Sequence, residues 1–124
     1  MMYVRHESNI AKMKISKVLV DIRTLSVDVA RYKADNGVYP STSQGLAALL
    51  RKPGSGPAPG NFPDDGYRKS MPLDPWDRPY QYRYPGEHKD FDIYTLGADG
   101  VPGGTGLDMD AGNWNLEEFA KAIE

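Results

Sequence analysis

The sequence predicts an α+β fold in which one long N-terminal helix packs on a small antiparallel sheet. Three observations lead to this prediction. No Pro or Gly interrupts residues 3–36, where apolar side chains recur at helical spacing. Aromatic and polar residues alternate just after residue 79, as on a strand, and a short apolar run follows beyond a Pro-Gly turn. The 10 prolines and 13 glycines fall mainly outside these segments, which indicates a loop-rich body.

Length and composition favour a single domain without thiol chemistry. We expect residues 1–124 to form one domain with a helical spine over 1–37, a connection and loop over 38–78, and a sheet, a Gly- and Asp-rich loop and a short helix over 79–124. The absence of cysteine excludes disulfides and thiolate metal sites. A balance of 15 basic against 17 acidic residues argues against a nucleic-acid partner. No apolar run reaches about 18 residues, so the chain as written is expected to be soluble.

The first segment is predicted to be an amphipathic helix from about Tyr3 to Asn36. Its apolar stripe has alternating spacings of three and four residues: Ile15, Val18, Ile22, Leu25, Val29 and Tyr32. Gly37 and Pro40 end the helix, because glycine commonly follows a helix and proline cannot continue one. No cap marks the start, so we expect the helix to have continued upstream. A coiled coil is the alternative, but the heptad pattern is short and packing on a sheet is favoured.

The central part is predicted to hold one short helix and one long loop. Ser41 and Gln44 have the spacing of a capping box, in which each side chain accepts a hydrogen bond from the other residue's backbone N–H. The short helix would run on to Pro53 and carry three leucines, Leu46, Leu49 and Leu50. Residues 53–66 are so rich in Pro and Gly that we expect a flexible surface loop without regular structure.

An antiparallel hairpin is predicted after residue 79. Tyrosines alternate there with polar residues, as on a half-buried strand: Tyr80, Tyr82 and Tyr84. Phe91 to Leu96 forms the second strand beyond a turn that starts at Pro85-Gly86. The tyrosine row is interpreted as packing, with a ligand-binding face as the alternative. A last short helix from Leu116 to Ile123 is expected, with Asn115 as its N-cap.

The stretch from Leu96 to Trp114 is rich in Gly and Asp and fits neither a helix nor a strand. Asp99, Asp108 and Asp110 lie close together in it, and the glycines between them let the backbone fold back. Ca²⁺ takes about 6–8 oxygens from carboxylates, carbonyls and water, and it tolerates irregular geometry. These residues therefore predict a local calcium site. The alternative is a solvated turn whose aspartates bond only to nearby backbone.

Two familiar calcium motifs do not match this stretch. An EF-hand is excluded because Asp108-x-Asp110-x-Gly112 lacks the third ligand position and the closing Glu spacing. The run from Gly103 to Asp108 matches the start of the β-roll calcium repeat, but it occurs once, and stacking needs about three copies. A single local site is the remaining possibility.

No catalytic arrangement is evident in the sequence. His6 lies in a polar helix start and His88 in a hairpin turn, and the serine-hydrolase, zinc-protease and P-loop motifs do not occur. Two pairs of carboxylates are interpreted as solvated loop and strand charges: Asp64 with Asp65, and Asp90 with Asp92. An enzyme is therefore not expected.

Together these segments resemble the major pseudopilins of bacterial type II secretion systems, which are relatives of type IV pilins. The resemblance runs in order from about residue 15 to residue 115, and the ordered series is far more specific than any one motif. It is carried by these stretches: Tyr39-Pro40-Ser41-Thr42, Gln44-Gly45-Leu46, Asp74-Pro75-Trp76, Pro79-Tyr80-Gln81-Tyr82, Pro85-Gly86, Asp92-Ile93-Tyr94, Leu96-Gly97-Ala98-Asp99-Gly100, Gly103-Gly104, Asp110 and Gly112-Asn113-Trp114.

The resemblance implies a pilin-like α+β fold with a calcium site in the loop after the last main strand. It also implies a structural subunit of the pseudopilus, a periplasmic filament that drives folded exoproteins through the outer-membrane secretin. Carried over by position, Asp99 and Asp110 match acidic ligands and Leu96 matches a backbone ligand. Asp108 stands where relatives often have Asn or another polar residue, and Thr105 stands where many have Glu.

Members of this family begin with a hydrophobic helical segment that prepilin peptidase processes and that is methylated, and this chain shows none of it. The resemblance therefore implies the periplasmic part of a protein anchored in the bacterial inner membrane. In full-length form it would associate with itself, with other pseudopilins and with inner-membrane secretion components. The alternative function is a monomeric extracellular module that binds protein or glycan in a calcium-dependent way, through its tyrosine strand or its Pro/Gly loop.

Overall fold

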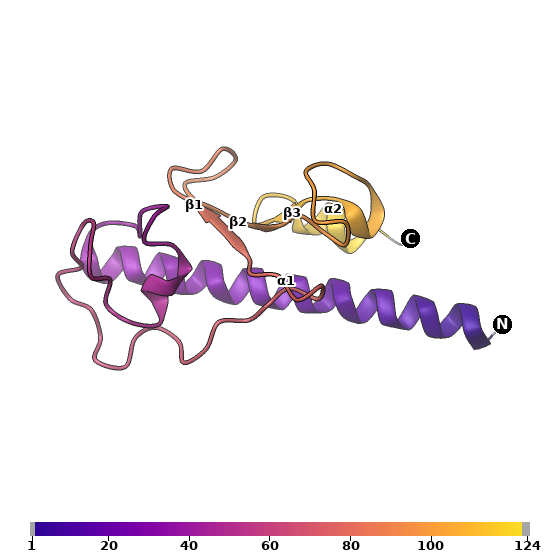
Figure 1. The fold of residues 1–124 in the computed structure, drawn as a ribbon, viewed down its shortest axis with the longest axis horizontal. Helices are drawn as coiled ribbons and strands as arrows, with labels where there is room; N and C mark the ends of the chain where they lie inside the picture. Colours follow the sequence, from indigo (N-terminus) through magenta and orange to yellow (C-terminus); the bar gives the residue numbers. More distant parts are fainter. Residues whose placement is uncertain (1, 123–124) are drawn as a thin grey trace.

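The computed structural model describes residues 2–122, with the side chains of residues 9–122, and it has the predicted α+β architecture. A 35-residue helix, α1 (Met2–Asn36), runs the length of the molecule; in Figure 1 the strands and the C-terminal helix lie above it, and the loops near its C-terminal end extend both above and below it. The N-terminal turns of α1 project beyond this body. The predicted helix and its end are confirmed, because Gly37 adopts φ 77° and donates its N–H to the Lys33 carbonyl at 2.8 Å.

The core lies between α1 and everything that covers it. All six residues of the predicted apolar stripe are buried, from Ile15 at 5% exposure to Tyr32 at 0%. Against them pack residues from the short helices, from the sheet and from the position just before β1: Leu46, Leu49, Tyr80, Tyr82, Ile93, Ala111 and Phe119. The prediction that the helix packs on the sheet is therefore confirmed, and α1 does not need a coiled-coil partner to bury this face.

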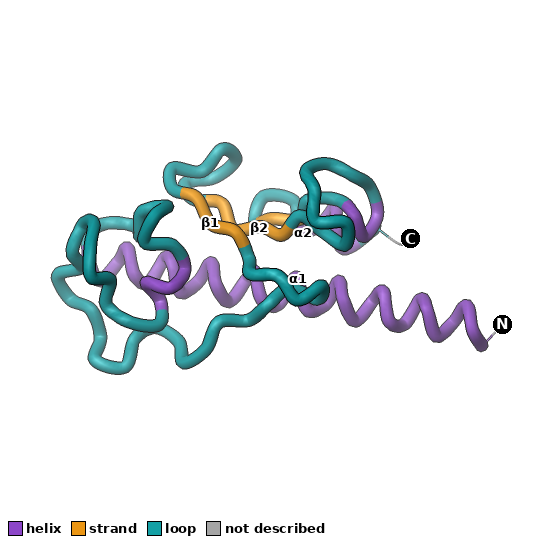
Figure 2. Tube along the Cα trace, viewed as in Figure 1, coloured by secondary structure: helices purple, strands orange, loops and turns teal. Residues whose placement is uncertain are grey.

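The sheet has three short antiparallel strands in the order β1-β2-β3: β1 (Gln81–Arg83), β2 (Asp92–Thr95) and β3 (Ala111–Gly112). Tyr82 pairs with Ile93, and Thr95 pairs with Ala111. The predicted hairpin is β1 and β2, each shorter than expected. β3 was not predicted, because two residues carry no alternation of polar and apolar side chains. Figure 2 shows how small the strands are beside the loops that join them.

The short helices differ from expectation. The capping-box bonds are present, at 2.9 Å from Ser41 N–H to Gln44 Oε1 and 3.1 Å from Gln44 N–H to Ser41 Oγ. They close a turn instead of starting an α-helix, because Gly45 at φ 65° takes the backbone out of the helical region. The helix that follows is the 3₁₀ turn η1 (Leu46–Leu49). No helix or strand forms within 53–66, as predicted, although Gln44 Nε2 anchors the loop through the carbonyls of Ser55 and Pro57.

The C-terminal helix is α2 (Leu116–Ala120), shorter than predicted, and the expected end at Ile123 lies outside the described residues. Asn115 precedes α2 but does not cap it with its side chain, which corrects the prediction. Its amide is engaged elsewhere: Oδ1 accepts the Gly112 N–H at 2.7 Å and Nδ2 donates to the Asp110 carbonyl at 2.8 Å. Asn115 thus joins β3 to the end of the Asp-rich loop.

Candidate metal centre

The predicted calcium loop connects β2 to β3 over residues 96–110 and contains the 3₁₀ turn η2 (Gly106–Asp108). Gly97 and Gly104 both have positive φ, 80° and 94°, and both approach the Asp108 carbonyl group. A Cβ at Gly97 would lie 2.7 Å from the Asp108 oxygen, and one at Gly104 would lie 2.6 Å from it. The loop therefore brings three separate backbone segments together in a packing that only glycine allows.

The four predicted ligand residues all belong to this loop, but they occupy different environments. Asp99 and Asp108 are exposed, whereas Leu96 and Asp110 are half-buried. The Asp110 carboxylate accepts the Gly103 N–H at 3.1 and 3.2 Å and so closes the second half of the loop. Asp99 Oδ1 accepts the Val101 N–H at 3.2 Å. The carboxylates of Asp99 and Asp110 are thus held by local backbone bonds, which the solvated-turn alternative also anticipates.

The donor atoms of the loop suit calcium in type. Among the described side chains, those of residues 9–122, no three or more His, Cys, Asp or Glu residues gather closely enough to hold a metal by themselves. Calcium does not require such a cluster, because backbone carbonyls and water can complete its oxygen shell. The loop offers carboxylates and carbonyls, and its residues 96–110 include no nitrogen-bearing side chain and no thiol, although Met109 carries a thioether sulfur. The residues present therefore fit calcium better than a transition metal.

Two residues that sequence analysis did not connect with the loop hold its first half. Arg78 donates from Nη1 to the Gly97 carbonyl at 2.7 Å and from Nη2 to the Ala98 carbonyl at 3.1 Å. Asp74, which is 3% exposed, accepts a 2.7 Å hydrogen bond from Thr95 Oγ1 at the end of β2. Both residues belong to the segment before β1. Asp and Arg side chains can make such hydrogen bonds, but the spacing of these two residues in the sequence does not predict contacts with the loop.

Asp92 corrects another expectation, because it is fully buried at the start of β2 and not solvated. Its carboxylate accepts hydrogen bonds from Arg83 Nε at 2.9 Å and from the backbone N–H groups of Glu87 and Lys89 at 2.8 and 3.1 Å. Burial acts to raise the pKa of Asp92, but the bonds from His88, Glu87, Lys89 and Arg83 outweigh it and lower the pKa to about 2. Asp92 therefore organises the β1–β2 turn. Asp90, which was also predicted to be a solvated charge, is exposed as expected.

The tyrosine row divides between core and surface. Tyr80 and Tyr82 are buried, and their hydroxyls donate at 2.7 Å to Asp21 Oδ2 and to the Pro40 carbonyl. Burial is the main cause that raises the pKa of each phenol, and for Tyr80 the Asp21 carboxylate adds to it. Tyr84 is 38% exposed. The packing interpretation is thus confirmed for two of the three tyrosines, Tyr80 and Tyr82, so the row itself does not form a continuous exposed face.

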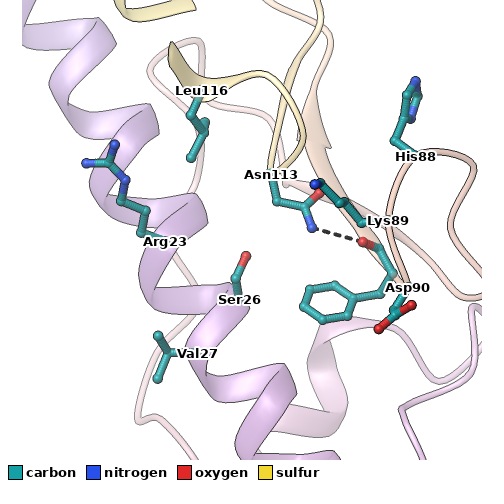
Figure 3. Close-up of a pocket in the computed structure, with 9 residues that line it drawn as sticks. Arg23, Ser26, Val27, His88, Lys89, Asp90, Asn113 and Leu116 are labelled. Atoms are coloured by element: carbon teal, nitrogen blue, oxygen red, sulfur yellow. Dashed lines mark hydrogen bonds between the residues drawn. The ribbon is translucent and has the colours of Figure 1, made fainter.

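A groove of about 700 Å³ lies between α1 and the segments that follow β1 and β3 (Figure 3). Ser26 and His88 line it, but Figure 3 shows them on opposite sides with the His88 ring turned away. That ring stacks on Trp114, with centroids 3.8 Å apart, and its Nδ1 lies 3.1 Å from Asp92. Ser26 and His88 therefore do not form a nucleophile and base pair.

Comparison with known proteins settles the family. The model of the family described as type II secretion system (T2SS), protein G, matches residues 5–114. The chain belongs to this family. It is 50% identical over 105 residues to the type II secretion system core protein G of Pseudomonas aeruginosa, covering 85% of this chain and 72% of that protein. It is 47% identical over 111 residues to the Vibrio cholerae protein of the same name, covering 90% and 75%.

A solved structure of a pseudopilin agrees with this family assignment. The major pseudopilin from the type 2 secretion system of enterohaemorrhagic Escherichia coli matches with a TM-score of 0.76 at 42% identity, over 87% of this chain and 92% of that chain. The resemblance that the sequence indicated is confirmed, as is the pilin-like fold of a long helix on a small antiparallel sheet. The chain is a structural component of type II secretion. No helix among residues 2–122 combines the length and apolar character needed to cross a bilayer.

Proposed function

We propose that this pseudopilin polymerises, in its full-length form, into a periplasmic filament that drives folded exoproteins through the outer-membrane secretin. One observation beyond family membership supports assembly. α1 exposes a second apolar row with seven-residue spacing: Met13, Val20 and Val27, at 71%, 58% and 58% exposure. Because the buried stripe of α1 lies on the other side of the helix, this row is free to meet another subunit.

Assembly would also involve the other parts of the secretion system. The full-length protein would be held in the inner membrane, processed by prepilin peptidase, methylated, and joined with other pseudopilins and inner-membrane components. We place the described body on the periplasmic side. The alternative, a monomeric module that binds protein or glycan, draws no support from the buried tyrosines Tyr80 and Tyr82.

Calcium is the second part of the proposal. We propose that Asp99, Asp108 and Asp110, with the Leu96 carbonyl, bind Ca²⁺ in the β2–β3 loop. An ion with two positive charges would offset the repulsion between carboxylates held on one short loop. Since it would bind only the folded loop, it would stabilise the fold by mass action, by about 2.7 kcal/mol at one hundred times its dissociation constant.

A complementation experiment tests the filament role. The chain, joined to the hydrophobic N-terminal segment of the Pseudomonas relative, would be expressed in a strain that lacks its own core protein G. We expect secretion and filaments to be restored, and Val20→Glu with Val27→Glu to abolish both. Ala30→Glu, at an exposed α1 position outside the row, is the matched control. Secretion without any filament, or filaments unaffected by the double charge, would contradict the proposal.

A further inference from the structure

The two halves of the β2–β3 loop are held in different ways. The first half, residues 96–100, is bonded to side chains from outside the loop. Arg78 donates to two successive carbonyls, Gly97 and Ala98, at 2.7 and 3.1 Å. Its guanidinium fills the space beside Gly100, where a Cβ would lie 2.7 Å from Arg78 Cζ. This close approach explains why a glycine, at φ 70°, occupies position 100.

Asp74 holds Arg78 in place and reaches the loop by a second route. Its Oδ1 accepts the backbone N–H groups of Trp76 and Arg78, both at 2.9 Å. Its Oδ2 accepts the Thr95 hydroxyl at 2.7 Å, and Thr95 Oγ1 in turn accepts the Gly97 N–H at 3.2 Å. Asp74 and Thr95 are 3% and 1% exposed, so this chain of bonds is shielded from water and each link is costly to break.

Among the described residues, no side chain from outside the loop bonds to its second half, residues 101–108, although the Leu107 carbonyl accepts the Ala98 N–H at 2.8 Å and the Leu107 side chain packs against the core. Within the described chain, the hydrogen bonds found for residues 101–108 all join residues of 98–110 to one another. They include Asp108 N–H to the Thr105 carbonyl at 3.0 Å and Gly103 N–H to Asp110. Residues 101–105 are all exposed. Such a segment opens more readily than one bonded to a buried network.

We infer that Asp74 and Arg78 are positioning residues that hold residues 96–100 in place before any ion binds, so that ion binding orders only residues 101–108. The part of this inference that concerns ion binding rests on the calcium site of the proposed function. A site that is partly ordered before binding binds an ion more tightly than a fully disordered one, because less conformational entropy is lost on binding. Arginine suits the role because its planar fork reaches two carbonyls at once, which a lysine ammonium cannot reproduce.

Amide hydrogen exchange with chelator and with calcium tests the inference directly. In chelator, we expect the Gly97 and Gly100 amides to exchange slowly and the Val101, Gly103 and Asp108 amides to exchange fast. Calcium should slow the second group and leave the first unchanged. Equal, fast exchange of both groups in chelator would overturn the inference. If calcium does not bind and changes no amide exchange rate, the calcium proposal fails. The exchange rates measured in chelator still decide whether residues 96–100 are held in place without an ion.

Calcium titration of variants separates positioning from simple electrostatics. Arg78→Ala removes a cation near the site, which by Coulomb attraction alone would tighten calcium binding. We expect the opposite, an affinity about ten- to a hundredfold weaker, as for other supporting residues of metal sites. Arg78→Lys keeps the charge but not the fork and should not restore affinity. Arg51→Ala, which removes an exposed cation elsewhere, is the control.

The exchange pattern of the variants completes the test. In Arg78→Ala, the Gly97 and Gly100 amides should exchange fast in chelator and slow down only with calcium. Arg78→Lys serves the same purpose should the alanine variant fail to fold. Unchanged or tighter calcium binding in both variants, with Gly97 still protected, would show that Arg78 does not position the loop.

Discussion

At the scale of single residues, two buried carboxylates of this pseudopilin, Asp74 and Asp92, organise turns. Asp92 gathers donors from Arg83, Glu87, His88 and Lys89, and Asp74 gathers donors from Trp76, Arg78 and Thr95. Each lies at a position where the backbone must reverse or enter a strand. A buried carboxylate is tolerated only when its oxygens are so bonded, because an unpaired one costs several kcal/mol.

Asp92 makes the stability of the fold depend on pH. Since its pKa is lowered to about 2 from the ordinary 3.8, the ionised form is favoured in the folded state. Its contribution, about 2 kcal/mol, is fully present above about pH 4 and is lost as the pH falls towards 2. Urea unfolding between pH 5 and pH 2 at roughly constant ionic strength would measure it.

Two variants isolate this effect. Asp92→Asn should lower stability near neutral pH and flatten the acid dependence, because its amide cannot accept from all of the donors that face Asp92. Asp90→Asn, at the exposed neighbouring position, should keep the acid dependence of the unaltered chain. An acid profile that is the same in both variants would assign the pH dependence to other groups.

At the scale of elements, α1 organises the molecule and its two faces have different roles. One face buries the stripe from Ile15 to Tyr32, and the other exposes Met13, Val20 and Val27. The helix ends sharply because Gly37 takes the left-handed conformation that closes the last turn.

Truncation of α1 side chains should separate these faces. Ile22→Ala removes a fully buried side chain and should cost about 2–5 kcal/mol in urea unfolding. Val20→Ala, at 58% exposure, should change stability by no more than about 0.5 kcal/mol. Comparable losses in the two variants would mean that the exposed row is covered in solution, for example by a second copy of the chain.

The helix end gives a matched pair of glycine substitutions. Gly37→Ala should cost about 1 kcal/mol, because φ 77° is strained for a residue with a Cβ although the space around it is open. Gly54 has the same open space without a positive φ, so Gly54→Ala should be neutral or slightly stabilising. Thermal unfolding followed by circular dichroism compares the two, and equal midpoints would show that the backbone at Gly37 is unstrained.

At the scale of the whole molecule, a body rich in loops is held against one helix by a small core and by side chains that tie loops together. Calcium is proposed to add stability that this core alone does not supply. At one hundred times the dissociation constant, the added stability of about 2.7 kcal/mol should raise Tm by roughly 10 °C.

Thermal unfolding in calcium, magnesium and chelator is the corresponding measurement. We expect a rise in Tm with calcium and not with magnesium, and its loss in Asp110→Ala. Asp64→Ala, which removes an exposed carboxylate from another loop, should respond to calcium like the unaltered chain. A Tm that is the same in calcium and in chelator would leave the family assignment intact and remove the calcium site.

Much of the fold was determined by the sequence alone, because local patterns carry it. The α1 stripe, the stop at Gly37 and the β1–β2 hairpin follow from periodicity and turn chemistry within a few residues. Three of the four proposed calcium residues, Asp99, Asp108 and Asp110, were predicted from the concentration of Gly and Asp in one loop, and Leu96 was added by the family resemblance; all four stay a prediction.

Only the tertiary structure decided the contacts between distant segments. β3 exists because β2 offers it a partner, and Asn115 bonds to Gly112 and Asp110 instead of capping α2. The burial of Asp92 and the contact of Arg78 with Gly97 follow from how the segments meet. Such contacts leave no periodic trace in the chain, because their partners come together only when α1 gathers the loops around its buried face.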